Sequence, residues 1–198
     1  IVRFNSLDSK KIEFLERPTN LGVWFHITNK CNLRCTYCYV KKTQDEMSEK
    51  LALKSLLKII KNAKKNGFEK VTIKFAGGEP TLRLNLIFNL VDKARIIAKK
   101  TQINIDFVIL TNGVNITEEQ SLLIKKKGIR VAVSLDGLRE YHDRQRIFPS
   151  GIGSFRFVEK SILNLKKAGV SFNVTVTVTS YNIVNLPELT DFLLKNDI

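Results

Sequence analysis

Apolar residues recur along the chain with two different spacings, which predicts strands and helices in regular succession. Short runs rich in β-branched and aromatic residues indicate strands at 23–28, 71–76, 103–110, 129–135 and 172–179. After the first, second and fourth runs, apolar residues recur with the spacing of an amphipathic helix, and helices are also predicted after the third and fifth runs. Five such strand–helix units favour right-handed crossovers and a single parallel sheet.

Polar and flexible residues mark where the predicted helices begin and end. Helix starts are predicted at Ser48, at Thr117 with Gln120 three residues later in a capping box, and at Ser154. A further helix is predicted to begin near Pro187, a favoured first-turn residue. Glycines that suit helix ends follow three of the helices: Gly67, Gly128 and Gly169.

The fifth predicted strand carries information about the shape of the sheet. Phe172 and three valines would occupy one of its faces, and an asparagine and three threonines the other. The overall pattern is compatible with a barrel and with an open doubly wound sheet. The polar face of 172–179 favours a barrel-like sheet with a ligand in its concavity.

Composition and charge narrow the class of protein. The 198 residues carry 33 Lys and Arg against 19 Asp and Glu, a formal net charge of +14. The lysines are dispersed over several predicted helices and no basic block interleaved with aromatics occurs, which indicates an ordinary basic surface and argues against nucleic acid as a partner. No apolar run has the length of a membrane span and no secretory pattern opens the chain, so we expect a soluble cytoplasmic protein.

All three cysteines of the chain lie within eight residues, as Cys31, Cys35 and Cys38. An odd, clustered set argues against a disulfide framework and for a metal site. A thioredoxin-like pair would leave Cys31 unexplained, and Tyr39 after the last cysteine excludes the usual c-type haem attachment pattern. Zinc held by the cysteines and His26 is one alternative. A [4Fe–4S] cluster with one open iron is the other, and we favour it.

Unusual residues cluster where the predicted strands end, which is where parallel α/β folds bind ligands. The first strand leads into the cysteines, and the second into Gly77–Gly78–Glu79–Pro80. The third strand ends at Thr111–Asn112–Gly113, and the fourth at Ser134–Leu135–Asp136–Gly137. We therefore expect one site built from four successive turns.

These motifs resemble those of the radical S-adenosylmethionine (radical SAM) superfamily. The C-x3-C-x2-C spacing with aromatic Tyr37 before the third cysteine is similar to its cluster motif, and Gly77–Gly78–Glu79–Pro80 is similar to its second motif. The resemblance implies an α/β fold, a partial (β/α)6 TIM-like barrel of parallel strands with five βα units in this chain. It places the core domain at 23–198, after a lead-in segment at 1–22.

The resemblance also implies cofactors and a reaction. A [4Fe–4S] cluster on the three cysteines would bind S-adenosylmethionine and cleave it reductively to a 5′-deoxyadenosyl radical, which abstracts hydrogen from a substrate. Tyr37, Gly77, Gly78 and Glu79 would contribute to cofactor binding. The two glycines would let the backbone approach the methionine ammonium group, and Glu79 would add negative charge near it. No residue is assigned as a catalytic acid or base.

The segment around Ser134 and the following His-Asp-x-x-Arg sequence resemble the SPASM-type subgroup, which includes anaerobic sulfatase-maturating enzymes and peptide maturases. That likeness implies that Ser134 and Arg146 contact the cofactor carboxylate, with Arg144 as a nearby competitor for the arginine role. It implies a peptide or protein substrate and an electron donor such as a flavodoxin or ferredoxin. The alternatives are a radical enzyme for a small metabolite and a zinc-stabilised binding domain.

The sequence differs from the family pattern in one respect. Related enzymes have six βα units, and the SPASM subgroup adds a cysteine-rich C-terminal region. The present sequence ends at Ile198 after five units. We therefore expect a sixth unit to follow in a longer protein.

Overall fold

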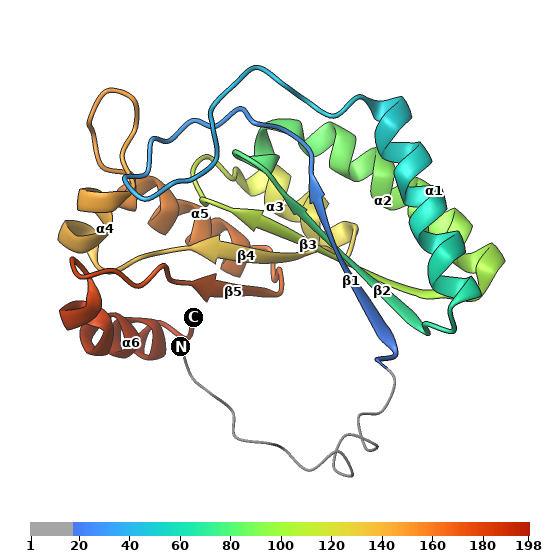
Figure 1. Cartoon of the computed structure of the whole chain (residues 1–198). Coiled ribbons are helices and arrows are strands. Elements are labelled where there is room, and N and C mark those ends of the chain that lie inside the picture. Colours follow the sequence, from blue (N-terminus) through green and yellow to red (C-terminus); the bar gives the residue numbers. More distant parts are fainter. Residues whose placement is uncertain (1–17) are drawn as a thin grey trace, which may run out of the picture.

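The computed structural model describes residues 18–198, and it contains one parallel sheet (Figure 1). Its strands are β1 (Asn20–His26), β2 (Lys70–Ala76), β3 (Asn104–Thr111), β4 (Arg130–Ser134) and β5 (Phe172–Thr175). The order in the sheet is β1-β2-β3-β4-β5, and each neighbouring pair is parallel. This confirms the predicted α/β fold, which is consistent with a partial TIM-like barrel.

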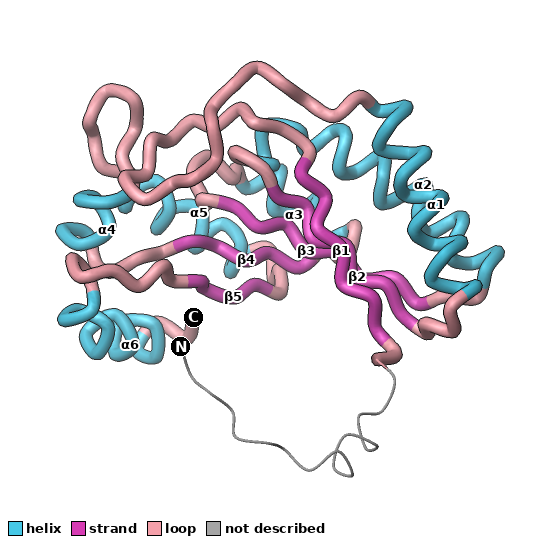
Figure 2. Tube along the Cα trace, in the orientation of Figure 1, coloured by secondary structure: helices cyan, strands magenta, loops and turns pink. Residues whose placement is uncertain are grey.

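Helices connect the strands and flank the sheet (Figure 2). They are α1 (Glu49–Lys65), α2 (Leu84–Thr101), α3 (Glu118–Lys126), α4 (Arg139–Gln145), α5 (Phe155–Lys167) and α6 (Leu186–Lys195), with 3-10 turns at Pro80–Arg83 and Ile183–Asn185. The pattern of apolar residues did not predict α4. That helix has only seven residues, too few to display a helical repeat.

Two strand boundaries differ from the prediction. The first strand was predicted at 23–28, but β1 begins at Asn20 and ends at His26, and Thr28 forms an isolated antiparallel bridge with Glu46. Of the predicted lead-in segment 1–22, residues 1–17 lie outside the described part of the chain. The fifth strand was predicted to reach 179, but β5 ends at Thr175 because its partner β4 ends at Ser134.

The predicted helix starts meet different outcomes. Ser48 caps α1 by accepting the Leu51 amide at 3.3 Å, and Thr117 forms the predicted capping box of α3. Helix α5 begins directly after Ser154, as predicted, but the Ser154 side chain makes no cap bond. Asp143 instead accepts the Phe155 amide of α5 at 2.8 Å. The predicted glycine stops all adopt left-handed conformations, with φ of 75° at Gly67, 50° at Gly128 and 65° at Gly169.

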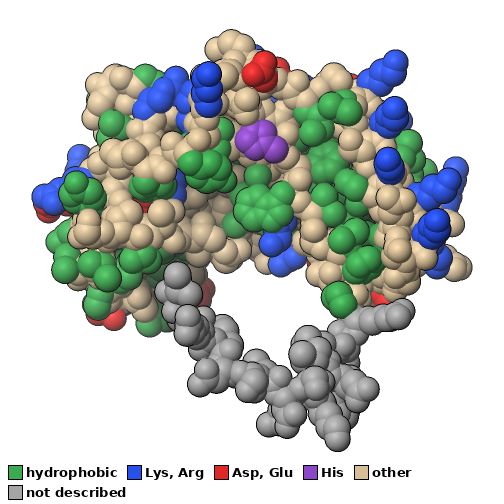
Figure 3. Space-filling model, viewed as in Figure 1, with side chains coloured by type: hydrophobic (Ala, Val, Ile, Leu, Met, Phe, Trp, Pro, Cys, Tyr) green, Lys and Arg blue, Asp and Glu red, His purple; other side chains and the backbone are tan. Residues whose placement is uncertain are grey.

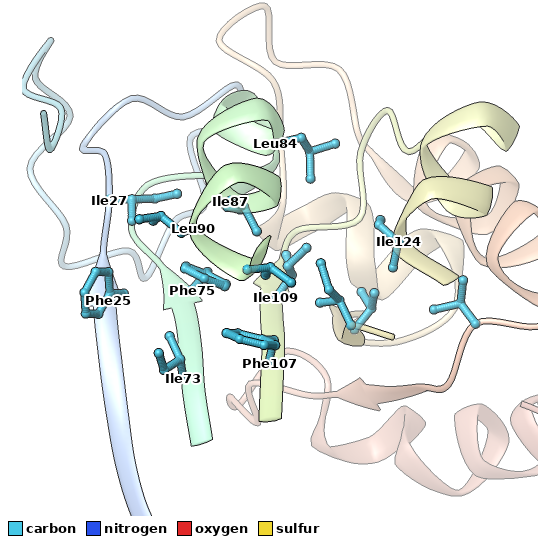
Figure 4. Close-up of a cluster of buried hydrophobic side chains, with 14 of the residues drawn as sticks. Phe25, Ile27, Ile73, Phe75, Leu84, Ile87, Leu90, Phe107, Ile109 and Ile124 are labelled. Atoms are coloured by element: carbon cyan, nitrogen blue, oxygen red, sulfur yellow. The ribbon is translucent and has the colours of Figure 1, made fainter. Parts of the chain in front are cut away.

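The main hydrophobic core lies between one face of the sheet and the helices that cover it (Figure 4). Phe75 is its centre: the ring packs edge-on against Phe25 and stacked on Phe107, each with ring centroids 6.2 Å apart. Alternation along each strand therefore sends one set of side chains into this core and the other set to the opposite face of the sheet.

Basic side chains lie on the surface of the helical part of the molecule. Figure 3 shows Lys and Arg side chains scattered along the edge of the molecule where α1 and α2 lie, without a single dense block. Among residues 18–198, a search for helices with the length and apolarity of a membrane span finds none.

Candidate functional site

A cavity of about 900 Å³ lies on the face of the sheet opposite the core, and it extends to the carboxyl ends of the strands. Most residues predicted to form the site line it together: Cys31, Cys35, Tyr37, Cys38, Gly77, Gly78, Ser134 and Arg146. The convergence expected from the strand ends is therefore present. Asn173 and Thr175 of β5 also face this cavity, as the polar face of that strand predicts.

The glycine pair holds the loop that carries the cysteines. Gly78 donates its amide to the Thr28 carbonyl at 2.6 Å, and Glu79 donates its amide to Lys30 at 2.8 Å. A Cβ on Gly78 would lie 2.2 Å from the Lys30 oxygen, and one on Gly77 would lie 2.3 Å from the Thr28 oxygen. Only glycine permits this approach, so the pair serves loop-to-loop packing in addition to lining the cavity.

A second segment holds the other side of the cysteine loop. The Arg34 amide donates to the Ile147 carbonyl at 2.7 Å, and the Thr36 amide donates to Gln145 at 2.9 Å. Leu33 is fully buried and anchors the loop in the core. The loop is therefore fixed between the turn after β2 and the segment after α4, and this second contact brings Arg146 beside the cysteines.

The three thiols have unequal environments. Burial raises the pKa of Cys31 and of Cys35, against the opposing effects of the Leu33 amide at Cys31 and of Arg146 at Cys35. Burial acts in the same direction on the exposed Cys38, but a hydrogen bond from Lys42 at 2.8 Å and the Val40 amide hold the pKa of Cys38 below its ordinary value. Of the three thiols, Cys38 is therefore the one whose surroundings favour the thiolate.

Glu79 lies in a different place from the one expected. Its side chain is fully buried behind the cavity rather than lining it. The carboxylate accepts the Thr81 amide and hydroxyl at 2.9 and 2.6 Å, the Thr111 hydroxyl at 2.7 Å and the Asn112 amide at 2.8 Å. Burial raises the pKa of Glu79, and these hydrogen bonds oppose that shift. Glu79 therefore joins the turn after β2 to the end of β3.

Asp136 organises the opposite side of the cavity, a role that sequence reasoning missed. Its fully buried carboxylate accepts Arg146 Nε at 2.7 Å and Nη2 at 3.3 Å, the Thr177 amide at 2.9 Å and the Tyr37 hydroxyl. The Arg146 guanidinium also lies 5.5 Å from the centre of the Tyr37 ring. The signal was available, because Asp136 stands in the turn after β4, but nothing in the sequence pairs it with Arg146.

These contacts limit the hydrogen bonds that Arg146 can make to a ligand. The expected two-bond contact with a cofactor carboxylate is already used in part, since Nε and Nη2 bind Asp136. Nη1 lies 4.0 Å from Cys35 Sγ, and Arg146 lines the cavity. The competitor Arg144 pairs with Glu140 at 2.6 Å on the surface, and it does not line the cavity.

A buried histidine supports the turn that contains Asp136. The Asp136 amide donates to His142 Nδ1 at 3.2 Å, and His142 Nε2 lies 2.9 Å from the Ser154 hydroxyl. Ser154 donates to the Arg146 carbonyl at 2.7 Å, so His142 carries its proton on Nε2. Burial, and then the charge of Arg146, lower the pKa of His142 to about 4. The imidazole is therefore neutral.

The donor set suits an iron–sulfur cluster better than a single zinc ion. In residues 18–198, no three His, Cys, Asp or Glu side chains are arranged to hold one metal ion. A zinc ion would need its sulfurs within about 2.3 Å of one centre, whereas each cysteine of a cluster binds a different iron. His26 hydrogen-bonds Asn29 through Nε2 at 2.6 Å, which gives it a local partner.

Comparison with known proteins agrees with this site. A cysteine-type anaerobic sulfatase-maturating enzyme of Clostridium novyi is 31% identical over 179 residues, covering 86% of this chain and 46% of that protein. An Fe-coproporphyrin III synthase of Methanosarcina barkeri is 29% identical over 197 residues, covering 96% and 46%. The chain thus spans about half the length of these relatives.

Solved structures show the same relationship. Native anSMEcpe with bound AdoMet and the Cp18Cys peptide superimposes with a TM-score of 0.77 at 27% sequence identity, covering 91% of this chain and 49% of that one. The family model for the Radical SAM superfamily matches residues 25–194, which include the last two residues of β1, the cysteine loop and the strands β2 to β5. This chain therefore belongs to the radical SAM superfamily, whose cofactors are a [4Fe–4S] cluster and S-adenosylmethionine.

Proposed function

We propose that this radical SAM enzyme modifies a side chain of a peptide or protein. The observation that carries the proposal is the likeness over 91% of the chain to a structure that holds AdoMet and a peptide. The cavity of about 900 Å³ beside the cysteines supports it, because its size is suited to a cofactor and part of a substrate together.

The residues divide the work as follows in this proposal. Cys31, Cys35 and Cys38 hold the cluster, and their loop stays in place through the contacts of Gly78 and Glu79. When bound, the cluster and S-adenosylmethionine supply an electron and a radical able to abstract hydrogen. Protein groups orient the cofactor and exclude water from it.

Cofactor binding is assigned to groups that face the cavity. The backbone at Gly77 and Gly78 receives the methionine ammonium group, and Ser134 with the Nη1 edge of Arg146 receives the carboxylate. Tyr37 lines the same space, with its hydroxyl tied to Asp136. Asn112, whose side-chain nitrogen lies 3.8 Å from Cys31 Sγ, is a further polar group at this point.

Anaerobic reconstitution tests the cluster assignment. The chain should take up iron and sulfide and, after reduction with dithionite, convert S-adenosylmethionine to 5′-deoxyadenosine. Each of Cys31→Ala, Cys35→Ala and Cys38→Ala should lose the intact cluster, because each removes one thiolate ligand. Stoichiometric zinc without iron uptake would contradict the assignment.

Arg146→Ala separates cofactor binding from cluster binding. It should keep iron and weaken S-adenosylmethionine binding about tenfold or more, as expected when a charge-assisted hydrogen bond is lost. Arg144→Ala is the matched control, since Arg144 pairs with Glu140 away from the cavity. Equal affinity in both variants would show that Arg146 does not bind the cofactor.

A second candidate is a radical reaction on a small metabolite, which the similarity to the Fe-coproporphyrin III synthase favours. Mass spectrometry of candidate peptides after turnover distinguishes the two functions. A stable mass change in a peptide, dependent on the cysteines, supports the first proposal. Turnover of a small molecule with no modified peptide supports the second.

The electron donor in this proposal is a reduced flavodoxin or ferredoxin. The net charge of +14 and the dispersed surface lysines would attract an acidic carrier. We propose a cytoplasmic location, since free thiols such as these persist in reducing compartments.

A further inference from the structure

One row of side chains crosses the inner face of the sheet, below the cysteine loop. Trp24 of β1 is the register partner of Lys74, Lys74 is the partner of Val108, and Val108 is the partner of Arg130. All four line the cavity. Lys74 Nζ lies 5.6 Å from the centre of the Trp24 ring, and Trp24 is 65% exposed. We call these four residues the inner row.

The charge of the cavity lining is one-sided. It includes five cationic side chains and, among the described residues, no Asp or Glu: Lys42, Lys70, Lys74, Arg130 and Arg146. Three of them have an acidic group or a thiol as a partner. Lys42 contacts Cys38, Arg146 binds Asp136, and Lys70 binds Asp106 at 2.6 Å.

Lys74 differs from these cations. Arg130 reaches Asp106, at 3.5 Å, but Lys74 forms no ion pair with any residue of the described chain, 18–198. It is half-buried in the middle of β2, and it lines the cavity. A cation held over an aromatic ring and without a carboxylate partner is suited to bind an anionic ligand.

The position of the inner row relative to the carboxyl ends of the strands also fits substrate binding. Lys74 lies two residues before the end of β2, about 7 Å along the strand from Ala76. The next row toward the carboxyl ends of the strands lines the cavity with the small side chains Ala76 and Ala132 and the larger His26 and Leu110. The same cavity of about 900 Å³ therefore extends from the inner row to the loop that carries the cysteines.

We propose that the inner row binds a carboxylate of the substrate, namely an acidic side chain of the peptide on which the enzyme acts. This inference rests on the proposed function and adds the chemical class that the cavity selects. Lys74 binds the carboxylate, and the exposed ring of Trp24 packs against the apolar stem of the same side chain. A residue of the peptide near that acidic side chain then lies toward the cysteine loop.

Trp24 provides the measurement, because it is the single tryptophan of the chain. The reconstituted protein is titrated anaerobically, without reductant, with acetyl-Ala-Ala-Glu-Ala-Ala-amide and with the same peptide carrying Gln in place of Glu. Trp24 emission and calorimetry follow binding. The Glu peptide should shift the emission with saturation, and the Gln peptide should bind at least about tenfold more weakly.

Variants place the effect at Lys74. Lys74→Gln should weaken binding of the Glu peptide about tenfold, and Lys74→Arg should retain it. Lys93→Gln, which removes an exposed lysine of α2 and leaves the same net charge as Lys74→Gln, should bind like the parent. Parent-like binding by Lys74→Gln, or an equal response to the two peptides, would overturn the proposal.

A third probe tests the source of the carboxylate. Free glutarate should bind more weakly than the Glu peptide, and tighter binding of glutarate would overturn the assignment to a peptide. None of these titrations requires turnover, so they stand apart from the test of the proposed function. Absence of 5′-deoxyadenosine with intact Glu-peptide binding would count against the reaction alone.

Discussion

At the scale of single residues, two buried carboxylates determine where the cavity's polar groups lie. Glu79 joins the turn after β2 to the end of β3 through Thr111 and Asn112. Asp136 holds Arg146 and the Tyr37 hydroxyl on the other side. Both carboxylates are fully buried, so the loss of their hydrogen-bond partners would leave buried polar groups unsatisfied. They act as positioning residues for groups that face the cavity.

Asp136→Asn should destabilise the fold by about 3–5 kcal/mol, because it leaves the buried Arg146 guanidinium without its counter-ion. Chemical denaturation measures the change. Glu140→Gln is the matched control: it removes the partner of Arg144 from an exposed pair and should cost less than about 1 kcal/mol. Similar losses of stability in the two variants would show that the buried Asp136 pair stabilises the fold no more than the exposed pair does.

Gly78→Ala should destabilise the protein by about 1–3 kcal/mol and reduce iron uptake on reconstitution, because its Cβ would collide with backbone oxygens of Asn29 and Lys30. The displaced atoms belong to the loop that leads into Cys31. Gly22→Ala is the control, since a Cβ there meets nothing within 4 Å. Normal iron content in Gly78→Ala would show that the glycine is not needed to place the cysteines.

At the scale of elements, α4 and the start of α5 are joined behind the site by a hydrogen-bonded chain. His142 of α4 accepts a hydrogen bond from the Asp136 amide and contacts the Ser154 hydroxyl. Ser154 in turn donates a hydrogen bond to the Arg146 carbonyl. Asp143 caps α5, and a Cβ on Gly153 would lie 2.0 Å from its Cγ. The short helix therefore serves to hold the turn after β4 and the Arg146 segment together.

This chain of contacts predicts an acid-sensitive contribution to stability. The pKa of His142 is about 4 in the folded protein, below the unfolded value of about 6.5, so the unfolded chain binds the proton more tightly. Stability from neutral His142 is complete above about pH 6.5 and is lost as the pH falls toward 4, by about 3 kcal/mol.

Denaturation at a series of pH values measures this loss. In His142→Gln the additional decrease between pH 6.5 and 4 should disappear, leaving the part that the carboxylates contribute. His26→Gln, at an exposed position, should keep the parent profile. If the two variants show the same pH dependence, the contribution does not come from His142.

At the scale of the whole molecule, the sheet separates two environments. One face carries the core centred on Phe75, and the other faces the cavity with its five cations. Successive residues of a strand point to opposite faces, so neighbouring positions such as Lys74 and Phe75 serve different purposes. Stability and ligand binding are thus assigned to opposite sides of the same strands.

Phe75→Ala should lower the free energy of unfolding by about 3–5 kcal/mol, because the ring is buried between Phe25 and Phe107. Leu57→Ala, at an exposed position of α1, should change it by about 0.5 kcal/mol. Thermal or chemical denaturation compares the two. A small effect of Phe75→Ala would show that the core tolerates the cavity by collapsing around it.

Much of the fold could be predicted from the sequence because it depends on local periodicity. The order of strands and helices, the parallel sheet, the caps at Ser48 and Thr117 and the glycine stops follow from patterns within a few residues. The end of β5 did not, because it depends on where its neighbour β4 ends. The short α4 did not either, since seven residues carry no repeat.

The sequence by itself determined which residues stand at the ends of the strands, since strand order and spacing place the cysteines, the glycine pair and Ser134 there. Only the tertiary structure decided which hydrogen bonds Asp136, Glu79 and Tyr37 form. Asp136 meets Arg146 across ten residues, Glu79 meets Asn112 across 33, and Tyr37 meets Asp136 across 99. Such contacts depend on how separate turns pack against each other, and no local pattern encodes that packing.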